Sequence, residues 1–300
     1  MNCSYCHLRR NRAKHENMTF YQIKLILDNF MEYAEERRVE RFKIGLVGGG
    51  EPLLQFDLIK KIINYSKRCD LFSFYTITNG TLVTEEILSF FKEEKNKINL
   101  NFSLDGYREL HNLCRKGHDD SGSFDVVMDA VKRYTSMFGE EPIINCTVHA
   151  KTIEMREKVF HFFKSNGFNR VCFSRMIGGY DLGLNISTES FEHFLLEALV
   201  QGFDMRQLQK MDSYDCTVYG MKCGVGRTNI FYANGNIFPC GRFINLEDYV
   251  IGQYDTPIQD VELNMKRFHS NSPNQCYYDS HIAEQKTFPL SSTNGREEAL

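Results

Sequence analysis

Apolar residues alternate between two spacings along the first two hundred positions of this chain. Helical spacing runs through residues 19–38, where Phe20, Ile23, Ile26 and Phe30 recur every three or four positions. Between the helical segments lie short runs rich in β-branched and aromatic residues. Strands are predicted at 41–47, 72–78, 98–104, 143–149 and 170–176, and further helices at 57–68, from 84 onward, and at 123–137, 153–165 and 188–203. Each strand is followed by a helix, which favours an α/β fold with a parallel sheet.

The helix starts carry capping residues. Thr84, Ser123 and Ser187 each stand directly before a helical segment, where a hydroxyl accepts a hydrogen bond from the first turn. The helix at 19–38 differs from the others because no strand precedes it. We therefore expect a further strand upstream of Met1.

The pattern changes near residue 210. Aromatic strands, glycines and spaced cysteines replace the long helices, and a β-hairpin is predicted at 229–238 with its turn at Asn234-Gly235. The last residues are polar and poorly patterned. We predict an α/β core over 1–209, a small cysteine-bearing domain over 210–284 and a disordered or non-native tail over 285–300.

Composition narrows the class of protein. The 300 residues are 42% hydrophobic, which is enough for a sizeable core. No run of about 18 apolar residues is present and the N-terminus has no apolar signal region, so neither a membrane span nor a secretory signal is predicted. The net charge of −3 indicates no general attraction to nucleic acid. We expect a cytoplasmic protein that binds neither membrane nor nucleic acid.

The ten cysteines fall into two groups. In a reducing compartment, clustered cysteines favour a metal site over disulfides. Four lie singly in helical or strand-like segments and are interpreted as small buried apolar residues: Cys69, Cys114, Cys146 and Cys172. Six lie in loops at the two ends of the chain: Cys3, Cys6, Cys216, Cys223, Cys240 and Cys276. The Cys3-x-x-Cys6 spacing indicates a metal or redox function.

Unusual residues follow the predicted strands, at the edge where α/β sheets bind ligands. In the segment 48–52, Gly-Gly-Gly-Glu-Pro, the glycines let a ligand approach the backbone, and the carboxylate of Glu51 suits an ammonium group. The alternative is a tight turn with a helix-capping Glu51. Ser103 and Asp105, two positions apart, face the same side and suit a ribose diol. For this pair, as for Thr78-Asn79-Gly80, ordinary turn chemistry is the alternative.

The order of these motifs resembles the radical SAM superfamily. Cys3-x-x-Cys6 is followed by Gly49-Gly50-Glu51-Pro52, Thr78-Asn79-Gly80 and Ser103-Leu104-Asp105-Gly106, with His111 and Arg115 downstream. The resemblance covers approximately residues 1–180 and implies a partial (β/α)6 TIM-like barrel that lacks its first strand. It also implies a CxxxCxxC loop with a 4Fe-4S cluster that binds S-adenosylmethionine and cleaves it reductively to a 5′-deoxyadenosyl radical.

The resemblance assigns roles to individual positions. Cys3 and Cys6 match the second and third cluster ligands, and His7 stands where an aromatic residue often packs by the adenine. The segment 49–52 matches the contact to the methionyl amino group. Ser103 and Asp105 match ribose and carboxylate contacts, and Arg115 a methionyl carboxylate contact. The implied cofactor-binding set is Gly49, Gly50, Glu51, Pro52, Thr78, Asn79, Ser103, Asp105 and Arg115.

The family's first cysteine would lie four positions before Cys3, ahead of Met1. An upstream truncation or a misplaced start accounts for both the missing cysteine and the missing strand, whereas degeneration of the motif accounts for the cysteine alone. We expect the native gene to supply one β-strand and one cysteine upstream. With two thiolates for a cluster that needs three, this chain is not expected to hold the cluster stably and is itself expected to be inactive.

The C-terminal cysteines resemble the start of a SPASM domain, an extension that carries auxiliary iron–sulfur clusters. Cys223-Gly-Val-Gly is followed by the hairpin and by Pro239-Cys240. The later cysteine run breaks down because position 279 is Asp. The implied auxiliary ligands are Cys216, Cys223, Cys240 and Cys276; a structural zinc site built from the same thiolates is the alternative.

The resemblance implies a peptide-maturing enzyme that removes a hydrogen atom from a precursor peptide or protein, with an electron donor of the flavodoxin or ferredoxin type. Sulfatase-maturing relatives, which form formylglycine, carry an Asp after the Pro-Cys element, but here Gly241 follows Cys240. A non-catalytic remnant that binds peptides is a third hypothesis. The basic stretch at 9–14 suits an acidic leader peptide, although a solvated charged face is the alternative.

Overall fold

The structure is a computed structural model that describes residues 1–6, 16–176, 182–205, 213–244, 246–268, 272 and 274–280. The predicted domain boundary at 209/210, the basic stretch at 9–14, His7 and the predicted tail at 285–300 lie outside these residues. Within the described part of the chain, none of the helices combines the length and apolarity needed to cross a bilayer.

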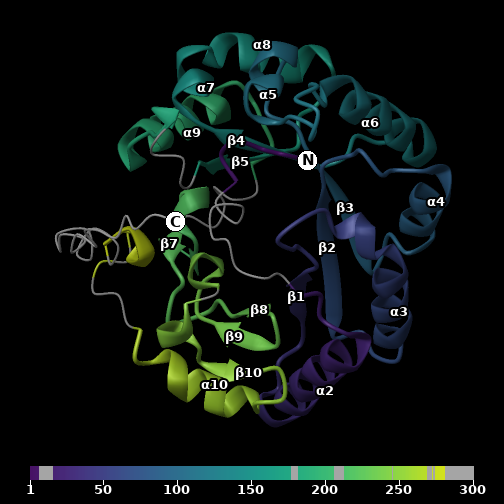
Figure 1. Ribbon diagram of the computed structural model, residues 1–300, viewed down its shortest axis with the longest axis vertical. Helices are drawn as coiled ribbons and strands as arrows, with labels where there is room; N and C mark the ends of the chain where they lie inside the picture. Colours follow the sequence, from purple (N-terminus) through teal and green to yellow (C-terminus); the bar gives the residue numbers. More distant parts are fainter. Residues whose placement is uncertain are drawn as a thin grey trace, which may run out of the picture.

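A curled sheet of parallel strands forms the centre of the molecule (Figure 1). The strands pair in chain order, with Phe42 opposite Phe72 and Phe74 opposite Ile98. The sheet is therefore a partial TIM-like barrel, and the predicted α/β class is confirmed. Its strands are β1 (Phe42–Gly45), β2 (Phe72–Thr78), β3 (Ile98–Ser103), β4 (Ile144–Val148) and β5 (Val171–Arg175).

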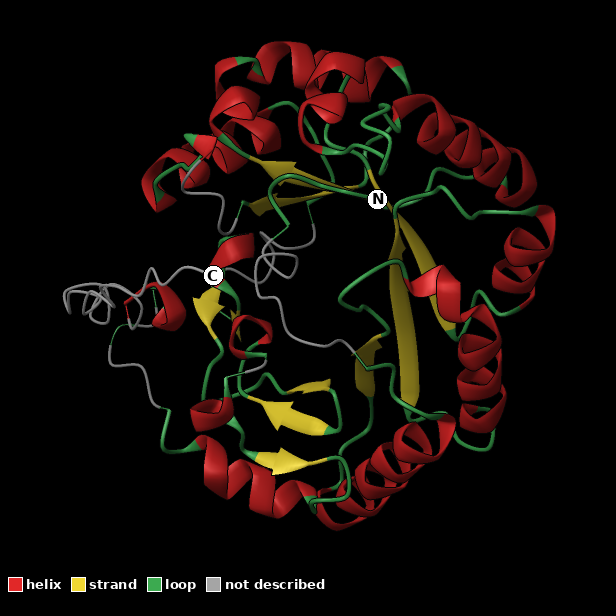
Figure 2. Ribbon diagram, viewed as in Figure 1, coloured by secondary structure: helices red, strands yellow, loops and turns green. Residues whose placement is uncertain are grey.

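Helices cover the outer face of this sheet (Figure 2). They are α2 (Phe20–Arg37), α3 (Phe56–Ser66), α4 (Glu85–Glu93), α5 (Arg108–Cys114), α6 (Phe124–Phe138), α7 (Ala150–Glu154), α8 (Arg156–Ser165) and α9 (Thr188–Val200). The predicted caps of α4 and α9 are confirmed, because Thr84 accepts from the Ile87 N–H and Ser187 from the Ser190 N–H. Ser123 precedes α6 as predicted, but its hydroxyl makes no capping bond and serves the site described below.

Two element boundaries differ from the prediction for local reasons. The predicted helix at 153–165 begins earlier, as α7 and α8, because the Thr152 hydroxyl accepts from the His149 N–H and starts a turn. The predicted helix at 188–203 ends at Val200, because Gly202 adopts a positive φ of 77° that breaks the helix. The short helix α5 was not predicted.

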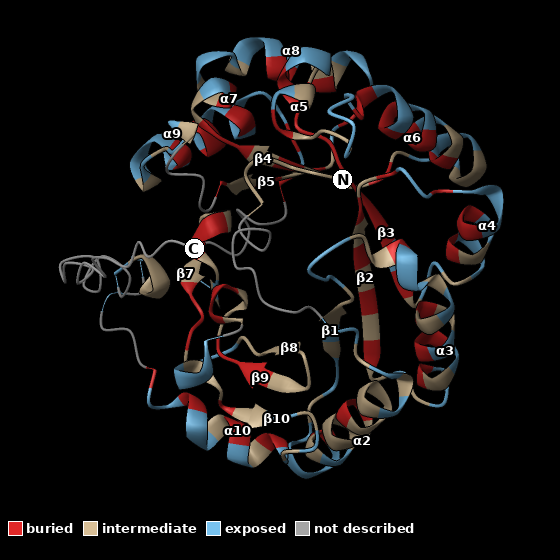
Figure 3. Cartoon of the chain, in the orientation of Figure 1, coloured by how far each residue is buried: buried red, intermediate tan, exposed pale blue. Residues whose placement is uncertain are grey.

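Buried residues lie between the sheet and the helices (Figure 3), and many of them are phenylalanines. On β2 alternate residues from Phe72 to Thr78 are buried, as a half-buried strand requires. Phe173 on β5 packs against Phe194 of α9 with ring centroids 5.1 Å apart. Each fully buried ring of this kind stabilises the fold by about 1.5–3 kcal/mol.

The remaining described residues form a C-terminal unit with its own small core. Its hairpin turns at Asn234 and Gly235, both with positive φ, so the hairpin predicted at 229–238 is confirmed. Strand β10 extends this hairpin into a three-stranded sheet, which was not predicted. The elements are β6 (Tyr214–Asp215), η4 (Thr217–Tyr219), β7 (Lys222–Cys223), β8 (Phe231–Ala233), β9 (Asn236–Phe238), η5 (Gly241–Phe243), η6 (Glu247–Tyr249), β10 (Gly252–Gln253) and α10 (Ile258–Met265).

The C-terminal unit joins the two ends of the curled sheet (Figure 1). On one side η4 packs against β5. On the other, Asn29 of α2 donates to the Thr256 carbonyl at 3.4 Å, and the Tyr33 hydroxyl donates to Glu262 of α10. The unit therefore occupies the side of the molecule where β1 and β5 do not pair with each other.

Candidate functional site

The loop after β1 and the end of β2 are joined through Glu51. One oxygen of the Glu51 carboxylate accepts from the Thr78 hydroxyl at 2.7 Å and from the Leu53 N–H at 3.2 Å. The other accepts from the Asn79 N–H at 2.8 Å. Burial raises the pKa of Glu51, and these three donors oppose that rise. Glu51 thus caps the 3-10 helix η1 (Pro52–Gln55), so the capping role considered from the sequence is present.

The glycines before Glu51 leave the backbone open. Residues 47–50 are exposed, and a Cβ placed on Gly50 would meet no atom within 4 Å. The structure therefore brings the predicted residues Glu51, Thr78 and Asn79 together, with Gly49, Gly50 and Pro52 beside them. A ligand at the end of β2 would meet this exposed backbone first.

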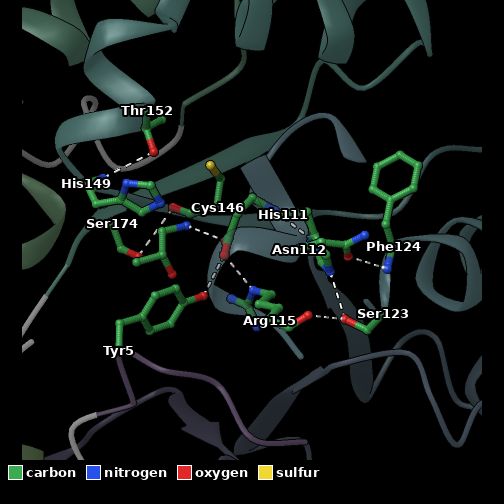
Figure 4. Close-up of polar contacts among 12 residues, drawn as sticks. Tyr5, His111, Asn112, Arg115, Ser123, Phe124, Cys146, His149, Thr152 and Ser174 are labelled. Atoms are coloured by element: carbon green, nitrogen blue, oxygen red, sulfur yellow. Dashed lines mark hydrogen bonds and ion pairs between the residues drawn. The ribbon is translucent and has the colours of Figure 1, made fainter. Parts of the chain in front are cut away.

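A buried carboxylate organises the end of β3. Asp105 has no exposed surface, and its oxygens accept from the Tyr5 hydroxyl at 2.6 Å, from Arg115 Nε at 2.7 Å and from the Thr147 N–H at 2.9 Å (Figure 4). Burial alone would raise the pKa of Asp105, but the charge and hydrogen bond of Arg115 outweigh it and the pKa falls. Asp105 and Arg115, both predicted site residues, form one buried ion pair.

His111 links this ion pair to the start of α6. Its Nδ1 accepts from the Asp105 N–H at 3.3 Å, so the ring proton lies on Nε2, 3.0 Å from the Ser123 hydroxyl. That hydroxyl donates in turn to the Arg115 carbonyl at 3.0 Å. Burial lowers the pKa of His111 to about 4, which keeps the ring neutral at pH 7. This chain of bonds connects the backbone N–H of Asp105 with the backbone carbonyl of Arg115.

The turn that carries Cys3 and Cys6 lies against the same residues. The Asn2 N–H donates to the Lys116 carbonyl at 2.7 Å and the Ser4 N–H to the Cys114 carbonyl at 2.9 Å. The Cys6 N–H closes the turn on the Cys3 carbonyl at 3.2 Å. Between the two cysteines, Tyr5 lies on Asp105 and under the Arg115 guanidinium. Burial raises the pKa of the Cys3 thiol, and the Arg115 charge opposes that rise.

Ser103 is the one predicted residue of this rim without a side-chain hydrogen bond to another described residue. It is the last residue of β3, two positions before Asp105, and is 9% exposed. Its proposed partner, a ribose hydroxyl, stays a prediction. The same holds for Arg115 as a carboxylate contact, because its Nε is already bound to Asp105.

The four C-terminal cysteines belong to the C-terminal unit and are close enough to interact electrostatically. Cys216 precedes η4, Cys223 ends β7, Cys240 precedes η5 and Cys276 starts the turn at 276–280. Burial raises the pKa of the Cys216 thiol to about 12 and that of the Cys240 thiol to about 11, and neighbouring thiols add to both shifts.

The number and type of ligand side chains at each site can be compared with those that an iron–sulfur cluster needs. Cys3 and Cys6, in one turn, fit two thiolate positions of a cluster that takes three. Within the described part of the chain, no set of three or more Cys, His, Asp or Glu side chains is arranged to hold a metal ion. The assignment of Cys216, Cys223, Cys240 and Cys276 as auxiliary ligands stays a prediction.

Sequence reasoning missed two residues of the site. Tyr5 stands between two cysteines that drew attention away from it, and its contact with Asp105 spans a hundred residues. His149, directly after β4, is fully buried, and neither ring nitrogen has a hydrogen-bond partner among the described residues. Figure 4 places its ring in the same cluster as Tyr5 and Arg115. Its position at a strand end was the available signal.

Comparison with known proteins places this geometry in a family. Residues 1–163, more than half of the chain, match the radical SAM superfamily. A cysteine-type anaerobic sulfatase-maturating enzyme from Clostridium novyi is 29% identical over 173 residues, which are 56% of this chain and 46% of that protein. The matched segment thus spans about half of that relative. An uncharacterized protein from Methanocaldococcus jannaschii is 25% identical over 256 residues, 80% of each chain.

Solved structures share the fold at low identity. Native anSMEcpe with bound AdoMet superposes with a TM-score of 0.71 at 21% identity, over 91% of this chain and 78% of that one. Streptococcus suis SuiB bound to its precursor peptide SuiA superposes with a TM-score of 0.64 at 16% identity, over 90% of this chain and 64% of that one. With the sequence match over residues 1–163, these observations show that the chain belongs to the radical SAM superfamily.

Proposed function

We propose that this protein is a radical SAM enzyme that modifies a peptide or protein substrate. Cys3 and Cys6 would hold two positions of a 4Fe-4S cluster, which would supply the electron for reductive cleavage of S-adenosylmethionine and so the radical chemistry that removes a hydrogen atom from the substrate. The observation that carries the proposal is the contact of the Cys3–Cys6 turn with the strand-end residues. Through Tyr5, the turn that carries the two cysteines is held against Asp105 and Arg115 in a chain that matches the family.

In this proposal, different residues of the chain contact different parts of S-adenosylmethionine. The exposed backbone at Gly49 and Gly50 offers a close approach for the methionyl amino group. The Glu51 carboxylate holds this loop to Thr78 and Asn79, so it positions the backbone that the cofactor meets. Asp105 and Arg115 hold the cysteine turn through Tyr5, and the Ser103 hydroxyl is the group offered to the ribose.

The proposed substrate is a ribosomally made precursor peptide. SuiB was solved with its precursor peptide and anSMEcpe with peptides, and both share this fold. The C-terminal unit is the proposed SPASM-like domain, with an auxiliary cluster on Cys216, Cys223, Cys240 and Cys276. The external electron donor in this proposal is a flavodoxin or ferredoxin.

Sulfatase maturation is the second candidate. Curated relatives that match this chain are named as anaerobic sulfatase-maturating enzymes, which favours it. Gly241 after Cys240 disfavours it, since Gly241 has no side chain that could accept a proton. A formylglycine assay on a sulfatase peptide decides: formylglycine from the loaded protein would replace the first proposal by the second.

The radical chemistry is tested with two forms of the protein. One is the chain as it stands, and the other carries an added N-terminal strand with a cysteine four positions before Cys3. Both are loaded anaerobically with iron and sulfide, mixed with S-adenosylmethionine and dithionite, and assayed for 5′-deoxyadenosine. We expect the extended form to make it and the variants Cys3→Ser and Cys6→Ser of that form to lose it.

The outcome also separates the enzyme from a non-catalytic remnant. A fully loaded extended form that yields no 5′-deoxyadenosine contradicts the proposed enzyme. If that form still binds S-adenosylmethionine by calorimetry, the chain is a binding protein that keeps the cofactor contacts without the chemistry.

A further inference from the structure

Two arginines share one carboxylate where the barrel meets the C-terminal unit. Asp279 Oδ1 accepts from Arg242 Nη1 at 2.7 Å, and Asp279 Oδ2 accepts from Arg175 Nη2 at 3.2 Å. Arg175 is the last residue of β5, and Arg242 lies in η5, directly after the Cys240 turn. The three residues therefore connect segments that are far apart in sequence.

The charges of this group do not balance. Arg242 is 5% exposed, the Arg175 side chain is 12% exposed, and the single Asp279 carboxylate offsets only one of their two charges. Arg242 Nη1 also donates a hydrogen bond to the Cys276 sulfur at 2.9 Å. A buried excess of positive charge is costly unless an anion accompanies it.

Both arginines also keep unused donors. The Nε atoms of Arg175 and Arg242 are buried and make no hydrogen bond to any residue that the structure describes. A guanidinium binds a carboxylate most strongly through two parallel N–H groups, and Nε with its neighbouring Nη forms one such pair. Each arginine therefore has a donor free on the edge through which it would clasp a carboxylate.

The group lies where a substrate would pass. Parallel α/β barrels bind their ligands at the C-terminal ends of the strands, and Arg175 stands at that end of β5. Asp279 is the accessible member, because its side chain is 32% exposed while both arginines are almost covered. An incoming carboxylate would therefore meet Asp279 and displace it from the arginines.

We propose that Arg175 and Arg242 form a carboxylate-binding site that Asp279 occupies in the free protein and that an acidic group of the peptide substrate takes over. The substrate part of this inference rests on the proposed function. The site itself does not, since it is built from the charges and donors of these three residues. The acidic group is either an Asp or Glu side chain or the C-terminal carboxylate of a peptide.

The first test removes the internal carboxylate and asks for rescue. Asp279→Ala leaves two buried guanidinium groups facing a space of carboxylate size, so its melting temperature falls. Sodium acetate should restore at least half of that loss, because a ligand of the folded state alone stabilises it. Acetamide at the same concentration and sodium chloride at the same ionic strength should not.

Matched variants locate the rescue. Asp279→Asn fills the same space without charge, so acetate should give it no more stability than acetamide does. The double variant Arg175→Gln/Asp279→Ala lacks one guanidinium, and acetate rescue should disappear. Equal effects of acetate and acetamide on Asp279→Ala, or an unchanged rescue in the double variant, overturn the site.

A second measurement uses the unmodified chain, so the test stands even where Asp279→Ala fails to fold. Binding is measured by NMR for the capped peptides acetyl-Gly-Glu-Gly-amide and acetyl-Gly-Gln-Gly-amide, and for acetyl-Gly-Gly-Gly with a free C-terminus. We expect an acidic peptide to bind at least tenfold more tightly than the Gln peptide, and Arg175→Gln to remove that preference. The stronger of the two acidic peptides identifies the kind of carboxylate.

Equal binding of all three peptides overturns the inference. Neither measurement involves cleavage of S-adenosylmethionine. A protein that makes no 5′-deoxyadenosine but shows acetate rescue therefore contradicts the proposed function and leaves the carboxylate site in place.

Discussion

The buried charge of Asp105 depends on the hydrogen-bond donors that surround it. Its carboxylate has no contact with water and depends on three protein donors, of which only Arg115 carries a charge. An ion pair of this kind adds little net stability, but removal of one partner leaves the other charge buried and unpaired. Asp105 therefore holds the cysteine turn in place, because both Tyr5 and Arg115 donate hydrogen bonds to its carboxylate.

Removal of the Arg115 charge should be severe. In Arg115→Met the Asp105 carboxylate keeps two neutral donors and loses its counter-ion, so we expect a loss of about 3–5 kcal/mol in the free energy of unfolding. Urea unfolding followed by circular dichroism measures it. The control is Asp105→Asn/Arg115→Met, which leaves no buried charge and should recover part of the loss. Equal destabilisation in the single and double variants would contradict the role of the charge.

His111 is expected to lower the free energy of unfolding in acid. Burial holds its folded-state pKa at about 4, below the ordinary value of 6.5, so only the unfolded chain takes up this proton between these values. Stability is complete above about pH 6.5 and falls by about 3 kcal/mol as the pH drops to about 4. The lowered pKa of Asp105 removes further stability below its usual range, as its carboxylate becomes protonated.

Urea midpoints between pH 7 and pH 4 test this slope. His111→Asn keeps a group of similar polarity without the titration, so its stability should depend less on pH over that window. An identical pH dependence in both proteins would show that other groups cause the acid sensitivity.

At the scale of elements, a substitution in the loop after β1 is expected to change cofactor binding without changing the stability of the fold. A methyl group on Gly50 meets no atom within 4 Å, so Gly50→Ala should change the free energy of unfolding by less than about 0.5 kcal/mol. The same methyl group obstructs a ligand that approaches the backbone. We expect about a tenfold weaker affinity for S-adenosylmethionine, or about 1.4 kcal/mol, measured by calorimetry on the extended form.

Gly235→Ala is the opposite control. Gly235 has a φ of 79° in the hairpin turn, so alanine is strained there and should cost about 1 kcal/mol of stability without an effect on cofactor affinity. If Gly50→Ala loses stability and keeps its affinity, the loop is structural rather than a ligand contact.

The elements were predictable from sequence because local rules determine them. Strand β2, with its strict alternation, and the Asn234-Gly235 turn carry their patterns in adjacent residues. The strand-end motifs could also be read, because a glycine run or an Asp-Gly pair is contiguous. The contact of Tyr5 with Asp105 and those of Asp279 with two arginines were not predictable, since they join residues 37 to 104 positions apart with no local pattern to indicate them.

At the scale of the whole molecule, the C-terminal unit connects the two ends of the sheet. It contacts β5 through η4 and α2 through α10, and the Arg175–Asp279–Arg242 group lies at the first of these contacts. An uncovered sheet edge presents unpaired N–H and C=O groups to other chains. The η4 contact therefore covers the β5 end of the sheet.

A variant that ends at Met205 should not behave as an independent domain. With the β5 end of the sheet uncovered, we expect it to form soluble aggregates or precipitate, whereas the full chain stays dispersed at the same concentration. Size-exclusion chromatography with light scattering distinguishes the two. A monomeric shortened form with the same melting temperature as the full chain would show that the contacts to α2 and β5 contribute nothing.

The same contacts have a consequence for synthesis in the cell. A ribosome finishes β1 through β5 while the residues of η4, η5 and α10 are still to be made. For that interval the β5 end of the nascent sheet is uncovered, although its helices are already able to pack. At roughly 5–20 residues per second the interval lasts several seconds, which is long enough for a chaperone to bind the exposed edge of the nascent chain. Yield during expression should therefore depend on translation speed and temperature more than the stability of the finished protein suggests.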